Sequence, residues 1–223
     1  MKFRLIVLVF LTLFLHPIKA QENDQKINTL DQQLSNGKIT SSKILSDPAY
    51  MTLHSLTPFR QMIRKHAKAE TLTMVTADEP GKKILVKGTI SDPKGNPQKN
   101  KLVYVYQTSD KGWYSDTGAH VLTMEGDRRH ARLFGYLKTD ENGNFSLNTI
   151  MPKGYPRSSL PAHIHLELTI DENSGLGTEL LFEEDPRLVG QIRENAIRER
   201  FYISKNSGTA DNPLYVYRIT TRD

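Results

Sequence analysis

Two histidines stand one residue apart in the sequence PAHIHLELTI, which covers residues 161–170. Alternate side chains of a β-strand share a face, so His163 and His165 would project together from a strand here. Their Cα atoms would lie about 6–7 Å apart, which lets two imidazoles bind one metal ion. The aliphatic residues between and after them would face the core. Alone, the pair fits zinc as well as iron, and two solvated polar residues are the alternative.

Two upstream tyrosines bear on the identity of the metal. Tyr155 belongs to a Tyr-Pro pair on the segment that leads into the expected strand, and Tyr114 follows an earlier strand and its turn. A free phenol has a pKa near 10, so a tyrosine that binds as phenolate at neutral pH needs a strongly Lewis-acidic ion. A trivalent ion meets that need better than Zn²⁺ because of its higher charge. Two tyrosines and two histidines therefore point to Fe(III).

The segments that must position these side chains have the two-residue period of strands. Alternation of apolar and polar residues predicts strands at 84–90, 101–108, 163–170 and 213–221, and a hairpin over residues 134–150 with its turn at 140–143. The turn residues between these strands favour short antiparallel connections. The sequence therefore predicts an all-β fold, an antiparallel β-sandwich with flanking helices.

Two helices are expected beside the strands. The first starts at Thr57, which can cap it, with Pro58 at the first helical position. The second follows Asp185 as cap and Pro186 as first residue. Its apolar stripe is expected to consist of Leu188, Val189, Ile192 and Ile197.

The first twenty residues have the features of a signal peptide. Lys2 and Arg4 precede an apolar run over residues 5–15, and Ala20 offers a small residue at the cleavage point. The run is too short for a comfortable membrane span, although an uncleaved anchor is the alternative. We therefore expect an exported protein, periplasmic or extracellular, without a stable membrane span after cleavage. Residues 21–56 read as a loose polar lead-in with little core, and 57–223 as the domain with its preceding helix.

Charge and cysteine content exclude several classes of protein. The chain of 223 residues has a net charge of +5, and loss of residues 1–20 leaves 27 basic and 25 acidic residues, a net charge of +2. No basic stripe interleaved with aromatic residues is present, so a nucleic acid partner is not expected. The chain has no cysteine, which rules out a disulfide scaffold. The sequence does not determine the oligomeric state, and a homodimer is one arrangement that it allows.

The motifs resemble those of the intradiol ring-cleavage dioxygenases, which open catechols. The resemblance runs from about Ile84 to Leu188 and rests on five motifs in the order of that family, namely GTISDPKGNP, VYVYQTSDKGWYS, GYLKTDENGNFSLNTIMPKGYP, PAHIHLEL and TELLFEEDPRL. It implies an enzyme that inserts O₂ into a small aromatic diol and releases a muconate-type diacid. In such an enzyme the iron acts as a Lewis acid and template.

The resemblance also implies roles for individual residues. Tyr114 and Tyr155 would be tyrosinate ligands of a non-haem Fe(III), with His163 and His165 as imidazole ligands. Tyr155 and His165 would be axial. A catechol would displace hydroxide and Tyr155, which makes Tyr155 a catalytic residue as well as a ligand.

This chain departs from the family at two positions that face the substrate in relatives. Leu160 stands where relatives often have an arginine, and Arg157 is the candidate that could replace it as a catalytic and substrate-binding residue. Glu179 stands where relatives often have a glutamine, also at a substrate-binding position. His120 and His130, between the tyrosines, are expected at the surface. A non-catalytic exported sandwich that binds ligands and a zinc site on the two strand histidines are the alternative functions.

Overall fold

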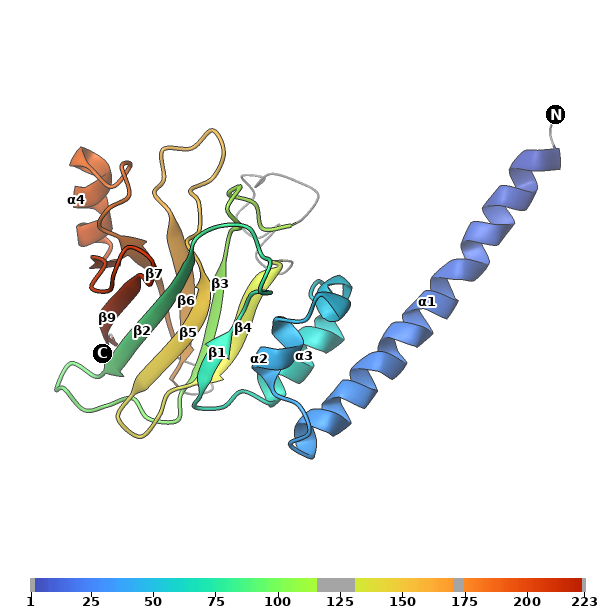
Figure 1. The fold of residues 1–223 in the computed structure, drawn as a ribbon, viewed down its shortest axis with the longest axis horizontal. Coiled ribbons are helices and arrows are strands. Elements are labelled where there is room, and N and C mark those ends of the chain that lie inside the picture. The colour runs from blue at the N-terminus through green and yellow to red at the C-terminus, as the bar shows by residue number, and fades with distance from the viewer. Residues whose placement is uncertain (1–2, 116–130, 171–174, 222–223) are drawn as a thin grey trace.

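Two β-sheets pack face to face in the computed structural model, which describes residues 3–115, 131–170 and 175–221 (Figure 1). The first sheet contains, in spatial order, β1 (Thr71–Thr73), β5 (Asn144–Ile150), β2 (Lys83–Ser91) and β9 (Leu214–Thr220). The second sheet contains, in spatial order, β4 (Leu133–Lys138), β3 (Leu102–Gln107), β6 (His163–Thr169), β7 (Gly175–Phe182) and β8 (Tyr202–Ser204). The predicted β-sandwich is therefore confirmed.

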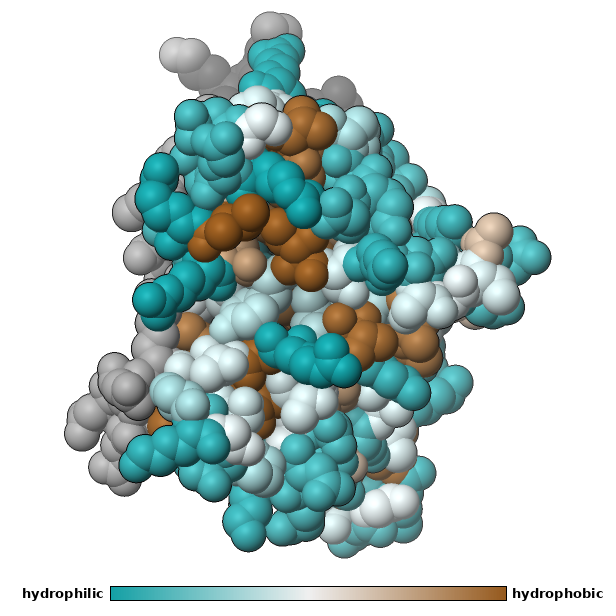
Figure 2. All heavy atoms as spheres, turned by 90° about the vertical axis from the view of Figure 1, so that its left-hand side faces the viewer, coloured by the Kyte–Doolittle hydropathy of each residue, from teal (hydrophilic) through white to brown (hydrophobic). Residues whose placement is uncertain are grey.

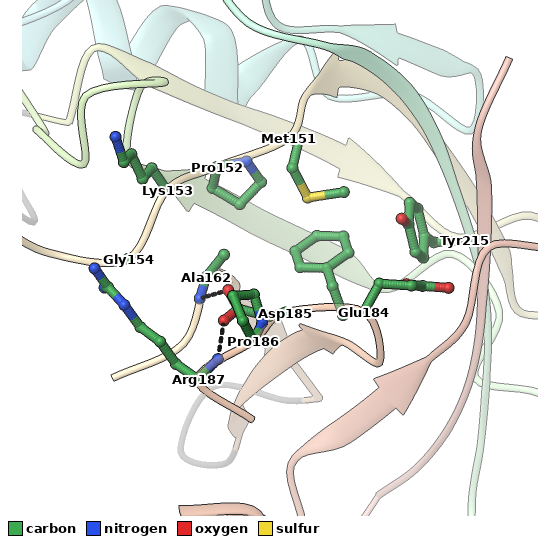
Figure 3. Close-up of a pocket in the computed structure, with 11 residues that line it drawn as sticks. Met151, Pro152, Lys153, Gly154, Ala162, Glu184, Asp185, Pro186, Arg187 and Tyr215 are labelled. Atoms are coloured by element: carbon green, nitrogen blue, oxygen red, sulfur yellow. Dashed lines mark hydrogen bonds between the residues drawn. The ribbon is translucent and has the colours of Figure 1, made fainter. Parts of the chain in front are cut away.

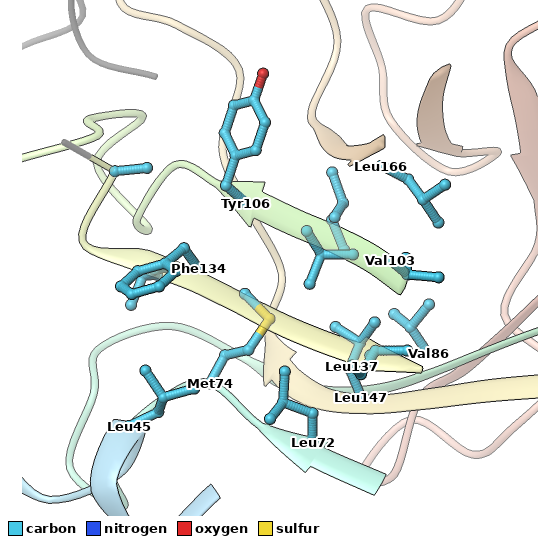
Figure 4. Close-up of a cluster of buried hydrophobic side chains, with 14 of the residues drawn as sticks. Leu45, Leu72, Met74, Val86, Val103, Tyr106, Phe134, Leu137, Leu147 and Leu166 are labelled. Atoms are coloured by element: carbon cyan, nitrogen blue, oxygen red, sulfur yellow. The ribbon is translucent and has the colours of Figure 1, made fainter. Parts of the chain in front are cut away.

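The core between the two sheets contains apolar side chains of both inner faces, and residues of the N-terminal helices extend it. Val86 and Leu147 of one sheet and Val103, Leu137 and Leu166 of the other belong to a single buried cluster (Figure 4). Each of these side chains is removed from water, and burial of one aliphatic side chain contributes about 1.5–3 kcal/mol. The alternation of β6 therefore leaves its histidines on the outer face of the second sheet.

The sandwich is not purely antiparallel as expected, because three strand pairs are parallel. These pairs are β1 with β5, β2 with β9, and β7 with β8. The connection from β7 to β8 passes through the helix α4 (Gly190–Arg198), so β8 enters the sheet from the same end as β7. Parallel strands need such long connections, and the turn signals of the sequence report only the short ones.

The predicted hairpin over residues 134–150 does not form, although its turn does. The Asp140 carboxylate accepts hydrogen bonds from the backbone N–H groups of Asn142 and Asn144, and Gly143 has a φ of +74°. The strands on either side, β4 and β5, nevertheless lie in different sheets. Both strands carry a buried apolar face, and the sandwich buries these faces against each other. Local alternation cannot distinguish this connection from a hairpin.

The two flanking helices differ from expectation at their N-termini: the first has a different N-cap residue, and the second begins later in the chain. Helix α3 (Thr57–Lys65) has Leu56 at its N-cap and no side-chain cap, so Thr57 is its first residue. Helix α4 begins at Gly190 because the turn before it engages Asp185, whose carboxylate accepts from the backbone N–H groups of Ala162 and Arg187.

The expected apolar stripe of the second helix is only partly buried. Leu188 is buried, but Val189 and Ile197 are 62% and 59% exposed. Figure 2 views the side of the molecule that carries α4, and apolar side chains interrupt the polar surface there. The prediction of this stripe was wrong because α4 lies at the end of the sandwich and contacts it through Ala196.

The segment 21–56 is not a loose lead-in, because it is mostly helical and supplies core residues. Helix α1 (Phe3–Ser35) is followed by α2 (Ser41–Leu45) and the 3₁₀ helix η1 (Pro48–Leu53). Ile27, Leu30 and Leu34 are at most 5% exposed. Their spacing places them on one helical face, which the polar composition around them conceals. In the described chain no helix has both the length and the apolar character that crossing a membrane demands.

Candidate metal centre

Four potential metal-binding atoms converge on the outer face of the second sheet. The Tyr155 hydroxyl lies 2.6 Å from the Tyr114 hydroxyl, 2.9 Å from His163 Nε2 and 3.3 Å from His165 Nε2. The two imidazole Nε2 atoms are 3.1 Å apart, and Tyr114 is 2.8 Å from His165 Nε2. Atoms that surround a metal ion at bonding distance of about 2 Å have such separations. The structure thus brings together all four residues that the sequence predicted as ligands.

The histidines owe their placement to the strand β6 and to contacts that fix their rings. His163 Nδ1 lies 2.8 Å from the carbonyl oxygen of Pro161, which can only accept, so Nδ1 carries the proton and the Nε2 lone pair faces the Tyr155 hydroxyl. The ring of Tyr106 stacks on His165 with 4.4 Å between centroids. Tyr106 is the partner of His165 in the register of β3 and β6. Contacts of this kind orient metal ligands before the metal binds.

The tyrosines come from two loops that approach each other closely. Gly112 has a φ of +78°, and a Cβ atom there would lie 2.6 Å from the Gly154 carbonyl oxygen. The Thr108 hydroxyl donates to the Lys153 carbonyl oxygen at 2.7 Å, which ties the same two loops together. Glycine at position 112 is thus required for the approach that brings Tyr114 and Tyr155 into contact.

Both tyrosines are buried, and this determines their protonation. Burial raises the pKa of Tyr155 to about 12, and it raises the pKa of Tyr114 still further. Two neighbouring phenolates could form only against a strong positive charge. The donor set of two phenols and two imidazoles, whose Nε2 atoms face the phenol oxygens, fits a trivalent ion such as Fe(III). The same set fits Zn²⁺ less well, since Zn²⁺ usually takes histidine, cysteine or carboxylate ligands.

Glu179 lies beside the site, on the strand next to the histidines. It pairs with His165 in the register of β6 and β7, and its Oε1 atom is 3.9 Å from His165 Nδ1. Glu179 groups with His163 and His165 as a set that could hold a metal ion. Nδ1 is the other nitrogen of the ring from the one that meets the tyrosines. Glu179 therefore approaches His165 from the Nδ1 side, whereas the tyrosines lie at its Nε2 side.

The second predicted substrate residue, Arg157, is not brought to the donor atoms by any described contact. It is exposed, it has a φ of +60°, and no hydrogen bond or ion pair of its side chain is found in the described part of the chain. Leu160 is 47% exposed nearby. The role of Arg157 stays a prediction. His120 and His130 lie outside the described residues.

Sequence reasoning missed Arg187, which supports the loop that carries Tyr155. Its Nη1 atom donates to the carbonyl oxygen of Leu160 at 3.2 Å and lies 3.5 Å from that of Tyr155. No sequence period links residues 155 and 187, and only the fold brings β7 and its following turn behind this loop. Arg187 stands at the end of the motif TELLFEEDPRL, which does not by itself indicate a contact with the Tyr155 loop.

A pocket of about 350 Å³ lies behind this loop, away from the four donor atoms (Figure 3). Figure 3 shows Lys153 and Arg187 at one end, Glu184 and Tyr215 at the other, and Met151 between them. Gly154 and Ala162, which line the pocket, adjoin two of the proposed ligands in the chain. None of the four proposed ligands lines this pocket, so it is distinct from the metal centre.

The fold and site define the class of protein. A family model described as "Dioxygenase" matches residues 57–220. The chain therefore belongs to this family, the intradiol ring-cleavage dioxygenases that its motifs resemble. The helix α3, the sandwich and all four donor residues fall within the matched range.

Among curated relatives, the catechol 1,2-dioxygenase of Acinetobacter baylyi is 29% identical over 126 residues, which cover 49% of this chain and 39% of that protein. The protocatechuate 3,4-dioxygenase beta chain of Burkholderia cepacia is 33% identical over 126 residues, covering 53% of this chain and 52% of that protein. This chain thus matches about half or less of the length of these relatives.

Solved structures agree on the fold. The dioxygenase domain of a dioxygenase and carbohydrate-binding protein fusion from Streptomyces sp. SirexAA-E has a TM-score of 0.51 and 22% identity, covering 70% of this chain and 88% of that one. Catechol 1,2-dioxygenase from Pseudomonas arvilla C-1 has a TM-score of 0.51 and 18% identity, covering 70% of this chain and 56% of that one. At these identities the likeness establishes the sandwich and leaves the substrate open.

Proposed function

We propose that this protein is a non-haem Fe(III) dioxygenase that inserts O₂ into a catechol-type diol and cleaves the ring between its two hydroxylated carbons. The observation that carries the proposal is the convergence of four donor atoms, with each neighbouring pair 2.6–3.3 Å apart. Tyr114, Tyr155, His163 and His165 would hold the ion. Membership of the dioxygenase family and relatives named for catechol and protocatechuate support this reading.

The ferric ion would supply Lewis acidity that favours the ionised diol and would hold the diol for reaction with O₂. The protein must accept the protons that the diol loses. Tyr155 suits this task, because burial raises its pKa to about 12 in the metal-free protein. With a pKa this high, the Tyr155 phenol oxygen would hold a proton at neutral pH whenever it does not bind the ion, so it could accept one from the diol. His163 keeps its orientation through the bond to Pro161.

The exposure of the donor residues indicates the side from which a diol would approach. The side chains of His165 and Glu179 are 20% and 25% exposed, whereas Tyr114 and His163 are 4% and 5% exposed as residues. The diol would therefore reach the centre past His165 and Glu179. A carboxylate at this opening disfavours anionic substrates, so we propose an uncharged catechol over one that carries a carboxylate.

The proposal is tested by loading the purified protein with iron and recording its visible spectrum, iron content and O₂ uptake with catechol. Fe(III)-tyrosinate centres absorb visible light, so the loaded protein is expected to be reddish, to hold one iron per chain and to convert catechol into a ring-opened diacid. A colourless protein with stoichiometric zinc would overturn the iron site. A coloured protein without O₂ uptake across a panel of catechols would favour the ligand-binding module.

We also propose that the protein is exported and that its signal peptide is residues 1–20. The charged start, the apolar run and Ala20 support this. Expression of the full chain in a Gram-negative host, followed by fractionation and intact-mass measurement, is expected to recover a chain that begins near Gln21 outside the cytoplasm. A cytoplasmic chain with the mass of all 223 residues would contradict export.

A further inference from the structure

We propose that Arg132 and Glu79 form a clamp that positions Tyr114 for metal binding, an inference that rests on the proposed ferric site. Neither residue belongs to the four donors or to the substrate side of the centre. Their link to the site is a backbone hydrogen bond, in which the Arg132 N–H donates to the Tyr114 carbonyl oxygen at 2.8 Å. A shift of residue 132 would therefore shift the residue that carries one of the two phenols.

Arg132 is held by its side chain in a geometry that allows little freedom. Its guanidinium donates to both oxygens of Glu79, with 2.6 Å between Nη2 and Oε1. The side chains of Arg132 and Glu79 are 13% and 4% exposed. Arginine and carboxylate in this bidentate arrangement are fixed in orientation as well as distance, unlike a pair joined by one contact.

The backbone on this side of Tyr114 is held from the N-terminal helices as well. His54 Nδ1 lies 2.9 Å from the Arg132 carbonyl oxygen, which accepts a hydrogen bond from it. Arg60 is 8% exposed and donates through Nη1 to the carbonyl oxygens of Ala131, at 3.0 Å, and of His54, at 3.1 Å. Three side chains from the region before β2 therefore converge on residues 131 and 132.

Glu79 is itself anchored, so the clamp has a fixed base. Lys83, at the start of β2, donates through Nζ to the carbonyl oxygens of Glu79, at 2.7 Å, and Thr76, at 3.0 Å. This ties the segment 76–79 to a central strand of the first sheet. Successive hydrogen bonds thus link Lys83 to Glu79, Glu79 to Arg132 and Arg132 to Tyr114.

A buried ion pair is a weak source of stability, because desolvation of both charges offsets their attraction. Its position next to a proposed ligand is better explained by a role in geometry. The Tyr114 hydroxyl must lie within about 3 Å of both Tyr155 and His165 at once, as it does at 2.6 and 2.8 Å. Misplacement of a functional group by 1 Å is enough to weaken a site strongly. Glu79 and Arg132 are thus positioning residues.

The test compares Glu79→Gln with Glu183→Gln, the same change in an exposed ion pair. Glu183 pairs with Arg193 at 2.9 Å, and their side chains are 42% and 38% exposed. Both variants are loaded with iron, and their visible band, iron content and kcat are compared with those of the parent protein. Glu79→Gln is expected to shift the visible band and to lower kcat about 10- to 100-fold, as loss of contacts around metal ligands typically does. Glu183→Gln is expected to match the parent.

A second readout does not depend on iron. Trp113 is the single tryptophan of the chain and precedes Tyr114, so its fluorescence in metal-free protein reports on this segment. Glu79→Gln is expected to shift the Trp113 emission maximum, and Glu183→Gln is not. If Glu79→Gln fails to fold by circular dichroism, Arg132→Lys, which keeps the charge and loses the bidentate contact, takes its place.

The outcomes separate the two proposals. A parent protein that binds no iron overturns the ferric site, while the Trp113 shift still decides whether the clamp positions the segment. A parent protein that is coloured and active, with a Glu79→Gln variant whose visible band, kcat and Trp113 emission match those of Glu183→Gln, overturns the clamp.

Discussion

Tyr155 has the central place among the donor atoms, since its hydroxyl lies within 3.3 Å of the other three. Burial also changes its chemistry, because its pKa rises to about 12. One residue thus combines the position of a ligand with the basicity needed to accept a proton from a bound diol. The individual side chains of the site therefore support a function in which Tyr155 both binds and reacts.

Tyr155→Phe removes one donor atom and the base without changing the shape of the ring. We expect weaker iron binding, a shifted visible band and loss of diol turnover, because the remaining donors cannot replace the phenolate. Absorption spectra and O₂ uptake check this. Tyr217→Phe is the control, since Tyr217 is also buried and its hydroxyl donates to the Leu181 carbonyl oxygen and to none of the four donor atoms. An unchanged visible band in Tyr155→Phe would show that Tyr155 is not a ligand.

Glu179→Gln tests the charge at the opening of the site. Removal of a partly exposed negative charge is expected to lower KM for carboxylate-bearing catechols by about fivefold, which corresponds to about 1 kcal/mol. KM for uncharged catechol is expected to change less. Steady-state O₂ uptake with both substrates checks this difference, and equal effects on the two would argue that Glu179 does not face the substrate.

The loops that carry the tyrosines depend on glycine where they cross. Gly112 has a φ of +78° and touches the backbone of Gly154, so the loop after β3 and the loop before β6 meet with no side chain between them. The same two loops carry Tyr114 and Tyr155. The formation of the donor set is therefore a property of the loops as a pair.

Gly112→Ala is expected to separate these loops, because its Cβ would lie 2.6 Å from the Gly154 carbonyl oxygen and its φ would be strained. The expected result is a folded protein with reduced iron content and a weaker visible band. Gly95→Ala is the matched control, since it has a φ of +86° but no neighbouring atom within 4 Å. Equal iron content in the two variants would contradict the requirement for close loop contact.

At the scale of the whole molecule, side-chain hydrogen bonds link the N-terminal helices to the sandwich. Asp31 of α1 accepts hydrogen bonds from Lys65, at 2.9 Å, and from His66, at 2.8 Å, at the end of α3. Arg60 of α3 in turn donates to the Tyr104 hydroxyl on the outer face of the second sheet. Residues 21–65 thus belong to the folded unit that supports the site.

Leu30→Ala is expected to lower the free energy of unfolding by about 2–4 kcal/mol, because Leu30 is 3% exposed and its truncation leaves a cavity. Denaturant unfolding checks this value. Gln32→Ala on the same helix is the control, since Gln32 is exposed and its loss is expected to change stability by less than about 0.5 kcal/mol. Equal stability of the two variants would show that α1 does not pack against the core.

Much of the site could be predicted from the sequence because its determinants are local. The alternation of β6 places His163 and His165 on one face whatever the strand packs against, and the Tyr-Pro pair precedes that strand in the chain. The turn at Asp140 to Gly143 is local in the same way, since Asp140 satisfies backbone groups two and four residues later. Strands β1 and β8, with three residues each, are too short to show a period.

The remaining features depend on contacts between segments that are distant in the chain. Whether β4 and β5 pair or pack across the sandwich is decided by β2 and β3, which bind them in separate sheets. The apolar face of α1 is recognisable only once α3 and the core are present to cover it. The contact of Arg187 with the Tyr155 carbonyl oxygen joins residues 32 positions apart in the chain. The ion pair of Arg132 and Glu79 joins residues 53 positions apart. Side-chain type and spacing therefore determine which residues can bind a metal, whereas tertiary packing decides which groups hold them in place, since orientation requires partners that the local sequence does not contain.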